Sequence, residues 1–152
     1  PNTPEMIEAH YAVPALGAVI NTLNTRLDAA ALGWQMEHCE AAVLIVDTAF
    51  GATMRDAVAA LTREIVIIDV CDGEFTGDGE RIGAHEYEAL LAAAVPVDTL
   101  AGPADEWDAI TGARDSAIDC RLVRLPGCDR SMMMPSRFIS AMASSPSGLS
   151  PP

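Results

Sequence analysis

Lysine is absent from all 152 residues, so arginine supplies every cationic side chain apart from histidine. Residues 1–110 also lack serine, and their 4 arginines stand against 19 acidic side chains, a net charge of −15. Phosphate-binding sites depend on Lys, Ser, Thr and glycine-rich backbone, and nucleic-acid binding depends on cations that neutralise phosphates. The composition therefore argues against a nucleic-acid partner and leaves residues 1–110 with little phosphate-binding equipment.

Long apolar runs are missing as well. No stretch approaches the roughly 20 residues that a membrane-spanning helix needs. The chain opens with Pro-Asn-Thr-Pro rather than with a basic segment followed by an apolar one. The sequence therefore predicts a soluble, cytoplasmic protein with no membrane span. Because Pro1 stands where a start methionine would be, we also expect a fragment of a longer reading frame or a processed end.

Cysteine and histidine are few, and their spacing matches no metal or disulfide motif. There is no C-x-x-C and no H-E-x-x-H, and only one Cys–His pair is adjacent in the sequence. We interpret the cysteines as small buried thiols of a reduced cytosol, with a small metal or redox protein as the alternative. The residues concerned are Cys39, Cys71, Cys120, Cys128, His10, His38 and His85.

The composition changes near Ile110, which divides the chain into two parts. Residues 111–152 hold eight serines and 5 arginines against 3 acidic side chains, a net charge of +2. This part is rich in turn-forming residues, as in Ser144-Ser145-Pro146-Ser147. We predict one folded domain over 1–110 and an unassigned tail over 111–152 that is disordered, out of frame or spliced from unrelated sequence.

Alternating helical and apolar segments predict an α/β fold. Runs of β-branched residues at 42–46 and 65–70 are typical of strands covered on both faces. We expect an extended segment at 19–23, and helices that begin at Pro4 and end near Pro14, and that cover 29–40, 52–63 and 86–94. The expected inward-facing helical residues are Leu32, Met36, Met54, Val58, Leu61, Tyr87, Leu90 and Leu91. Such alternation indicates a mainly parallel sheet flanked by helices.

A polar loop follows the second strand. Acidic residues and glycines crowd positions 72–80, but they do not match the calcium-loop pattern, so a solvated surface loop is favoured over a cation site. The glycines at 77–83 do not end a strand and open a helix, as a dinucleotide-binding loop would. We assign no ligand to this loop.

Four segments carry a family resemblance. They open the first helix, cover the extended segment, join the second helix to the first strand, and close residues 1–110. The segments are Pro1-Asn2-Thr3-Pro4-Glu5, residues 17–27, residues 37–47 and residues 103–110. In this order they resemble the N-terminal region of AMP-forming acyl-CoA synthetases, in the fatty-acyl branch of the adenylate-forming ligases. The resemblance implies part of an α/β adenylation subdomain, and for the full-length enzyme it implies ATP, Mg²⁺ and CoA.

The chain departs from that family directly after Ile110. Where the family has a Thr/Ser/Gly-rich phosphate loop with a lysine, this chain has Thr111-Gly112-Ala113-Arg114-Asp115-Ser116. We therefore expect the chain to be inactive alone, and we assign it no catalytic, cofactor-binding or metal-binding residue. The expected partner is the missing remainder of the enzyme or a second copy. A non-catalytic α/β interaction module is the alternative.

Several side chains remain as candidates, each with a structural explanation that we favour. Arg26 is expected to make an ion pair or hydrogen bond, and Trp107 to anchor a linker on the core. His10 and His38 lie on expected helices and are typical of packing or capping groups. Asp47 and Asp69 follow strands, where α/β proteins often place functional carboxylates.

Overall fold

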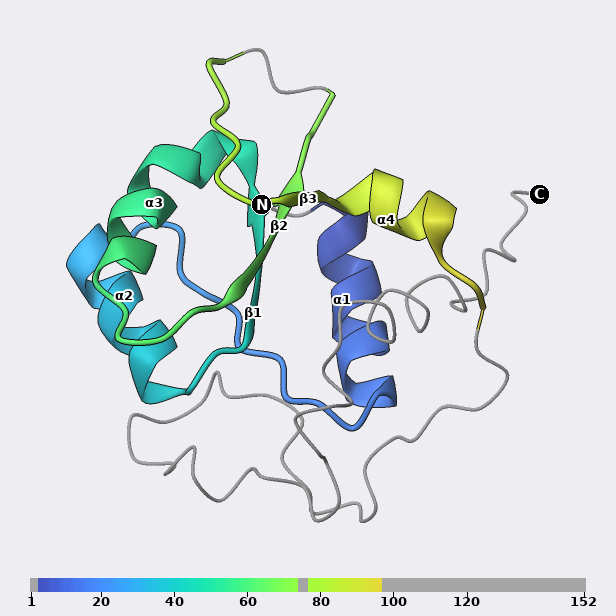
Figure 1. Cartoon of the computed structure of the whole chain (residues 1–152), viewed down its shortest axis with the longest axis horizontal. Helices are drawn as coiled ribbons and strands as arrows, with labels where there is room; N and C mark the ends of the chain where they lie inside the picture. The colour runs from blue at the N-terminus through green and yellow to red at the C-terminus, as the bar shows by residue number, and fades with distance from the viewer. Residues whose placement is uncertain (1–2, 74–76, 97–152) are drawn as a thin grey trace.

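Three layers make up the part of the chain that the computed structural model describes, residues 3–73 and 77–96 (Figure 1). Helices α2 and α3 cover one face of a small sheet, and α1 and α4 cover the other (Figure 1). The helices are α1 (Pro4–Ala15), α2 (Ala29–His38), α3 (Gly51–Ala59) and α4 (Tyr87–Ala93), with a short 3₁₀ turn, η1 (Thr48–Phe50), before α3. The strands are β1 (Val43–Asp47), β2 (Val66–Val70) and β3 (His85–Glu86).

The sheet is parallel throughout, in the order β1-β2-β3. β1 and β2 pair along their whole length, from Val43 opposite Val66 to Asp47 opposite Val70. Since β1 and β2 are joined through α3, they form the crossover unit that the alternating pattern predicts. The predicted α/β class is confirmed. β3 was not predicted, because two residues are too few to show a period.

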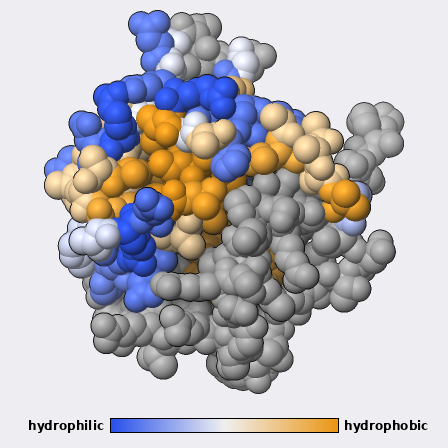
Figure 2. All heavy atoms as spheres, in the orientation of Figure 1, coloured by the Kyte–Doolittle hydropathy of each residue, from blue (hydrophilic) through white to orange (hydrophobic). Residues whose placement is uncertain are grey.

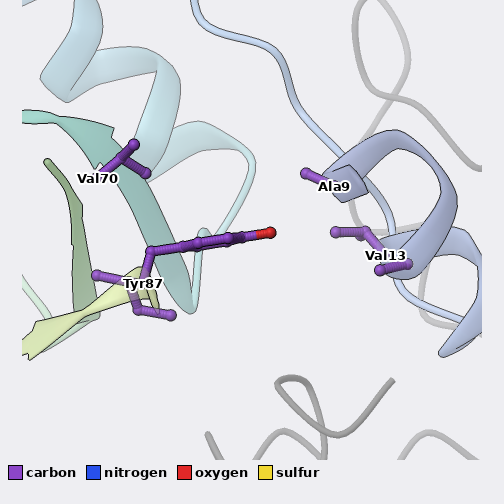
Figure 3. Packing of buried hydrophobic residues seen from close by; sticks show 6 residues of the cluster. Ala9, Val13, Val70 and Tyr87 are labelled. Atoms are coloured by element: carbon purple, nitrogen blue, oxygen red, sulfur yellow. The ribbon is translucent and has the colours of Figure 1, made fainter. Parts of the chain in front are cut away.

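The layer of α1 and α4 packs on the sheet through Tyr87. Its ring extends from the start of α4 towards Ala9 and Val13 on α1, with Val70 of β2 beside it (Figure 3). The Tyr87 hydroxyl donates to Glu8 Oε2 at 2.6 Å, so the one polar atom of this buried side chain has a partner. Burial and the neighbouring Glu8 carboxylate raise the pKa of Tyr87 far above its ordinary value. The inward orientation predicted for Tyr87 is confirmed, and Leu90 and Leu91 pack against the same cluster.

The layer of α2 and α3 is built as its periodicity predicts. Asp28 accepts a hydrogen bond from Ala31 N at 2.8 Å and caps α2. Leu32 and Met36 are buried on its inner face, opposite Met54 of α3. Among the helices of the described ranges, none combines the length and apolarity that crossing a bilayer requires.

α1 begins at Pro4 as predicted and ends at Ala15, one residue beyond Pro14. The extended segment predicted at 19–23 contains no regular strand, and Ile20 alone makes a β-bridge. Its side chains still alternate: Ala18 and Ile20 pack towards α1, whereas Leu23 packs towards α2. The tail predicted over 111–152 lies outside the described residues.

Two predicted helix ends were wrong. α2 stops at His38, and Glu40 adopts a left-handed conformation with φ 51°. Ala41 N donates to Met36 O at 3.0 Å, which closes the helix with a turn that usually has glycine at the left-handed position. α3 stops at Ala59 rather than at Arg63.

The residues after α3 leave the helix because they bind α2 instead. The Thr62 hydroxyl and backbone N–H donate to the Glu37 carboxylate at 2.6 Å and 3.2 Å. Arg63 Nη2 donates to the Glu37 carbonyl oxygen at 2.5 Å. The hydrogen bonds from Thr62, together with the positive charge of Arg63, lower the pKa of the Glu37 carboxyl below its ordinary 4.5.

We expect Glu40→Gly to stabilise the fold by about 0.5–1 kcal/mol, because glycine adopts the left-handed conformation without the steric cost that a Cβ carries. Urea unfolding measures the difference in the free energy of unfolding between this variant and the wild type. The matched control is Ala60→Gly at the end of α3, where φ is −86°. Ala60→Gly should destabilise the protein. Equal effects of the two substitutions would contradict the left-handed conformation of Glu40.

We expect acid to remove the contribution of the Glu37 carboxylate to the stability of the fold. Its folded-state pKa is lowered, so the stabilisation is complete above about pH 4.5 and is lost as the pH falls below that value. Glu37→Gln should therefore show a flatter pH dependence of the unfolding midpoint between pH 7 and pH 3. The control is Glu64→Gln at an exposed glutamate. If the Glu37→Gln and wild-type profiles run parallel, the interpretation is wrong.

Candidate functional site

The carboxyl ends of β1 and β2 lie at one edge of the sheet, where open α/β sheets commonly bind their ligands. Asp47 and Thr48 stand at the end of β1, and Asp69 stands near the end of β2. All three side chains are buried. This edge is therefore the place to look for chemistry in the described part of the chain.

Asp69 is a fully buried carboxylate, with 0% of its surface exposed. Its Oδ1 accepts from Ile82 N at 3.1 Å, and its Oδ2 accepts from Gly83 N at 3.0 Å. Arg81 Nε also donates to Oδ2, at 3.3 Å. A buried charge is tolerated only when it is paired and hydrogen-bonded, and residues 81–83 of one short loop supply these donors in the described part of the chain.

The same loop fills the carboxyl edge of the sheet. Glu80 N donates to Thr48 O at 2.9 Å, and the Glu80 carboxylate forms an ion pair with Arg55 on α3. A Cβ at Gly51 would collide with the Glu80 carbonyl oxygen, so the close approach of loop and helix requires glycine. The predicted surface loop over 72–80 is exposed at Gly73 and residues 77–79, while the Glu80 backbone bonds to the sheet edge, a contact that was not predicted.

Asp47 has a local role too. Its Oδ1 accepts from Ala49 N at 2.8 Å and caps η1. Asp47 and Asp69 lie within the last residues of β1 and β2 rather than after the strands, and each accepts from backbone N–H groups of its own surroundings. The hydrogen bonds of both carboxylates within the described residues thus stabilise the local backbone.

The histidines and Arg26 lie apart from this edge. His10 Nδ1 donates to Met6 O at 2.7 Å within α1. The His38 ring stacks on Trp34 with centroids 4.9 Å apart, so both histidines pack or cap on helices as predicted. Arg26 N donates a hydrogen bond to Asn24 Oδ1, which agrees with the structural ion-pair or hydrogen-bond role predicted for this residue.

The two described cysteines are less buried than predicted. Cys39 is half-buried, and its Sγ accepts from Asn21 Nδ2 at 3.1 Å. Cys71 is exposed, so the prediction of buried thiols is wrong for it. Within the described ranges, no group of three or more His, Cys, Asp or Glu side chains is arranged to hold a metal ion. Trp107, Cys120, Cys128 and residues 111–116 lie outside those ranges.

Sequence reasoning missed the role of residues 79–83. The signal available was the set of glycines at 51, 79 and 83, each of which lies against another segment. Because these glycines are far apart in the sequence, the pattern does not show that they all allow close packing of loop 79–83 against α3, η1 and β2. A buried Asp in the otherwise apolar run 65–70 was the second signal, because such a charge demands donors from elsewhere.

The chain is similar to known proteins over most of its length. The family model described as AMP-binding enzyme matches residues 1–109. An acetate–CoA ligase from Humulus lupulus is 34% identical over 122 residues, covering 73% of this chain and 22% of that protein. A peroxisomal acetate/butyrate–CoA ligase from Arabidopsis thaliana is 36% identical over 121 residues, covering 72% and 21%. A peroxisomal benzoate–CoA ligase from the same plant is 33% identical over 107 residues, covering 66% and 18%.

The chain thus spans about a fifth of the length of these curated relatives. No solved structure matches it significantly.

Asp69→Asn should destabilise the fold by about 2–4 kcal/mol, because the amide has one acceptor oxygen fewer and turns an NH₂ group towards backbone donors. Chemical unfolding measures the loss, and hydrogen exchange at Ile82 and Gly83 should accelerate. The matched control is Asp47→Asn, which disturbs a single hydrogen bond and should cost about 1 kcal/mol. Equal costs at the two positions would refute a special role for Asp69.

Proposed function

The chain belongs to the AMP-binding enzyme family, and on this premise we propose that it is one part of an AMP-forming acid–CoA ligase. The match of the family model to residues 1–109 carries the proposal. The relatives at 33–36% identity are all ligases that join a carboxylic acid to CoA. The three-layer arrangement with a parallel sheet agrees with part of such a subdomain.

The reaction proposed for the complete enzyme has two steps. A carboxylate oxygen attacks the α-phosphorus of ATP, and pyrophosphate leaves with the electron pair of the broken P–O bond. The CoA thiolate then attacks the acyl carbon of the adenylate, and AMP leaves. Both steps need cations or backbone donors aimed at the phosphate.

The described residues do not fit a bound nucleotide. Arg55, Arg63 and Arg81 each pair with a carboxylate of the chain itself. The backbone N–H groups of Ile82 and Gly83 already donate to Asp69. With these donors engaged, we derive no catalytic step from the described part of the chain. Its role in the proposal is that of scaffold, and the isolated chain is inactive.

The proposed substrate class is a carboxylic acid. The sequence resembles the fatty-acyl branch, whereas the relatives are named for acetate, butyrate and benzoate. A panel that tests the proposal therefore includes short, aromatic and long-chain acids. In this proposal the partner of the chain is the remainder of the ligase.

We also propose where the protein is located in the cell. The composition of the chain favours the cytoplasm, while the name of the Arabidopsis acetate/butyrate–CoA ligase places that enzyme in peroxisomes. Imaging of a fluorescent fusion of the complete gene product, alongside a peroxisomal marker, separates the two compartments.

We expect no ATP–pyrophosphate exchange by the isolated chain with any acid of the panel. A chimera in which residues 1–109 replace the matched fifth of the Humulus lupulus acetate–CoA ligase should show acetate-dependent exchange, because the chain supplies the scaffold and the ligase supplies the nucleotide site. The intact Humulus enzyme is the positive control.

Two results would contradict this proposal. Exchange by the isolated chain above the level of a no-protein blank would overturn its inactivity. A folded chimera that shows no exchange with any acid, beside an active intact enzyme, would overturn the ligase assignment.

A further inference from the structure

Helix α1 has apolar residues on both of its sides. Ala9, Ala12 and Val13 are buried on the inner side, in the cluster that contains Tyr87. Ile7 and Tyr11 lie one turn apart on the opposite side, and 62% and 73% of their surfaces are exposed. A surface helix usually has polar residues on its outer side, and a helix that is apolar on both sides is typical of one that is covered on both.

The exposed apolar residues of α1 form one stripe. Pro4, Ile7, Tyr11 and Pro14 follow one another at intervals of three and four residues, which places them on the same side of the helix. This stripe is the outer face of α1, and none of its four residues carries a charge. It runs along almost the whole 12-residue helix, about 15 Å.

The described part of the chain ends close to α1. Helix α4 lies beside α1 (Figure 1), and its Leu90 and Leu91 pack against the cluster that holds Ala9. Beyond α4 the described residues run only to Pro96, and 74% of the surface of Val95 is exposed. Figure 2 shows apolar residues gathered over the sheet and continuing towards α4 on the visible face. The chain therefore leaves the described part next to α1, along an apolar surface.

The next residues of the chain can reach the outer face of α1. Trp107 comes 11 residues after Pro96, and an extended chain of that length spans up to about 36 Å, roughly twice the length of α1. The family model matches residues 1–109 as one unit, so α1 and most of the segment 103–110 belong to the same matched region.

Tethering and charge favour this segment over other occupants. A segment on the same chain is present at a high effective concentration, whereas a separate partner has to be bound from solution. A second copy is disfavoured because residues 1–110 carry a net charge of −15, and two such bodies repel each other.

We propose that residues 103–110 return across the outer face of α1 and that the ring of Trp107 packs on Ile7 and Tyr11. A Trp–Tyr contact of this kind buries a large apolar area and adds the attraction of an aromatic pair. The inference goes beyond the proposed function and does not depend on it, because both sides of the contact lie in this chain.

A double-mutant cycle in the 152-residue chain tests the contact. Tyr11→Ala and Trp107→Ala are made singly and together, and urea unfolding gives the equilibrium constant for unfolding of each variant. Both substitutions remove the same contact, so the double variant should unfold about threefold or more less readily than the product of the two single effects predicts. Tyr11 is exposed among the described residues, so its replacement leaves the buried cluster of α1 intact.

The matched control cycle combines Trp107→Ala with Leu27→Ala, at another exposed apolar residue that lies outside α1. In this cycle the two effects should multiply to within about twofold. If a variant does not fold, nuclear Overhauser effects between the Trp107 indole and the Tyr11 ring in the wild-type chain decide the matter.

Three outcomes would overturn the inference. Independent effects of Tyr11→Ala and Trp107→Ala, or no Overhauser effect between the two rings, would place Trp107 elsewhere. A coupling that grows with protein concentration would identify a second copy as the occupant. Protection of α1 from hydrogen exchange only on addition of the Humulus lupulus ligase lacking its matched fifth would identify the remainder of the ligase. All three leave the ligase assignment standing, since the chimera tests that separately.

Discussion

The fully buried carboxylate of Asp69 organises the carboxyl edge of this sheet. Asp69 lies in β2 with no exposed surface, and Arg81, Ile82 and Gly83 supply its donors. Since an unpaired carboxylate at this depth would cost several kcal/mol, β2 is stable only with the loop seated against it. The seated loop then brings β3 into register beside β2, and β3 leads directly into α4. The contact between Asp69 and the loop therefore helps to position β3 and the start of α4 beside β2.

The hydrogen bonds that occupy this edge of the sheet matter for function. Carboxyl ends of parallel strands are common ligand sites because they present unused polar groups, yet here Thr48, Asp47 and Asp69 all bond to the chain's own backbone. The described arginines near the sheet are engaged in ion pairs. In the described residues, these polar groups at the sheet edge are therefore engaged in contacts within the chain.

Sequence reasoning succeeded where a local pattern had one physical meaning. The cap at Asp28, the apolar stripe of α2 and the β-branched runs of β1 and β2 all specify their element without help from distant residues. It failed where the outcome depended on a distant partner. The pattern could not show that Thr62 leaves α3 to bond to Glu37 on α2, or that Glu80 reaches Arg55. Glu40 was placed in a helix because nothing in its neighbourhood marks a left-handed residue.

The amino-acid sequence by itself determined the α/β class, the four helices, the two long strands and the family to which the chain belongs. These follow from periodicity, caps and ordered motifs, which act over a few residues. Only the tertiary structure decided that Asp47 and Asp69 accept from nearby backbone N–H groups, that residues 79–83 pack on the sheet edge, and that β3 pairs with Ile68 and Asp69 of β2. The physical reason is that a buried carboxylate and an edge strand are defined by what faces them, and those groups come from elsewhere in the chain.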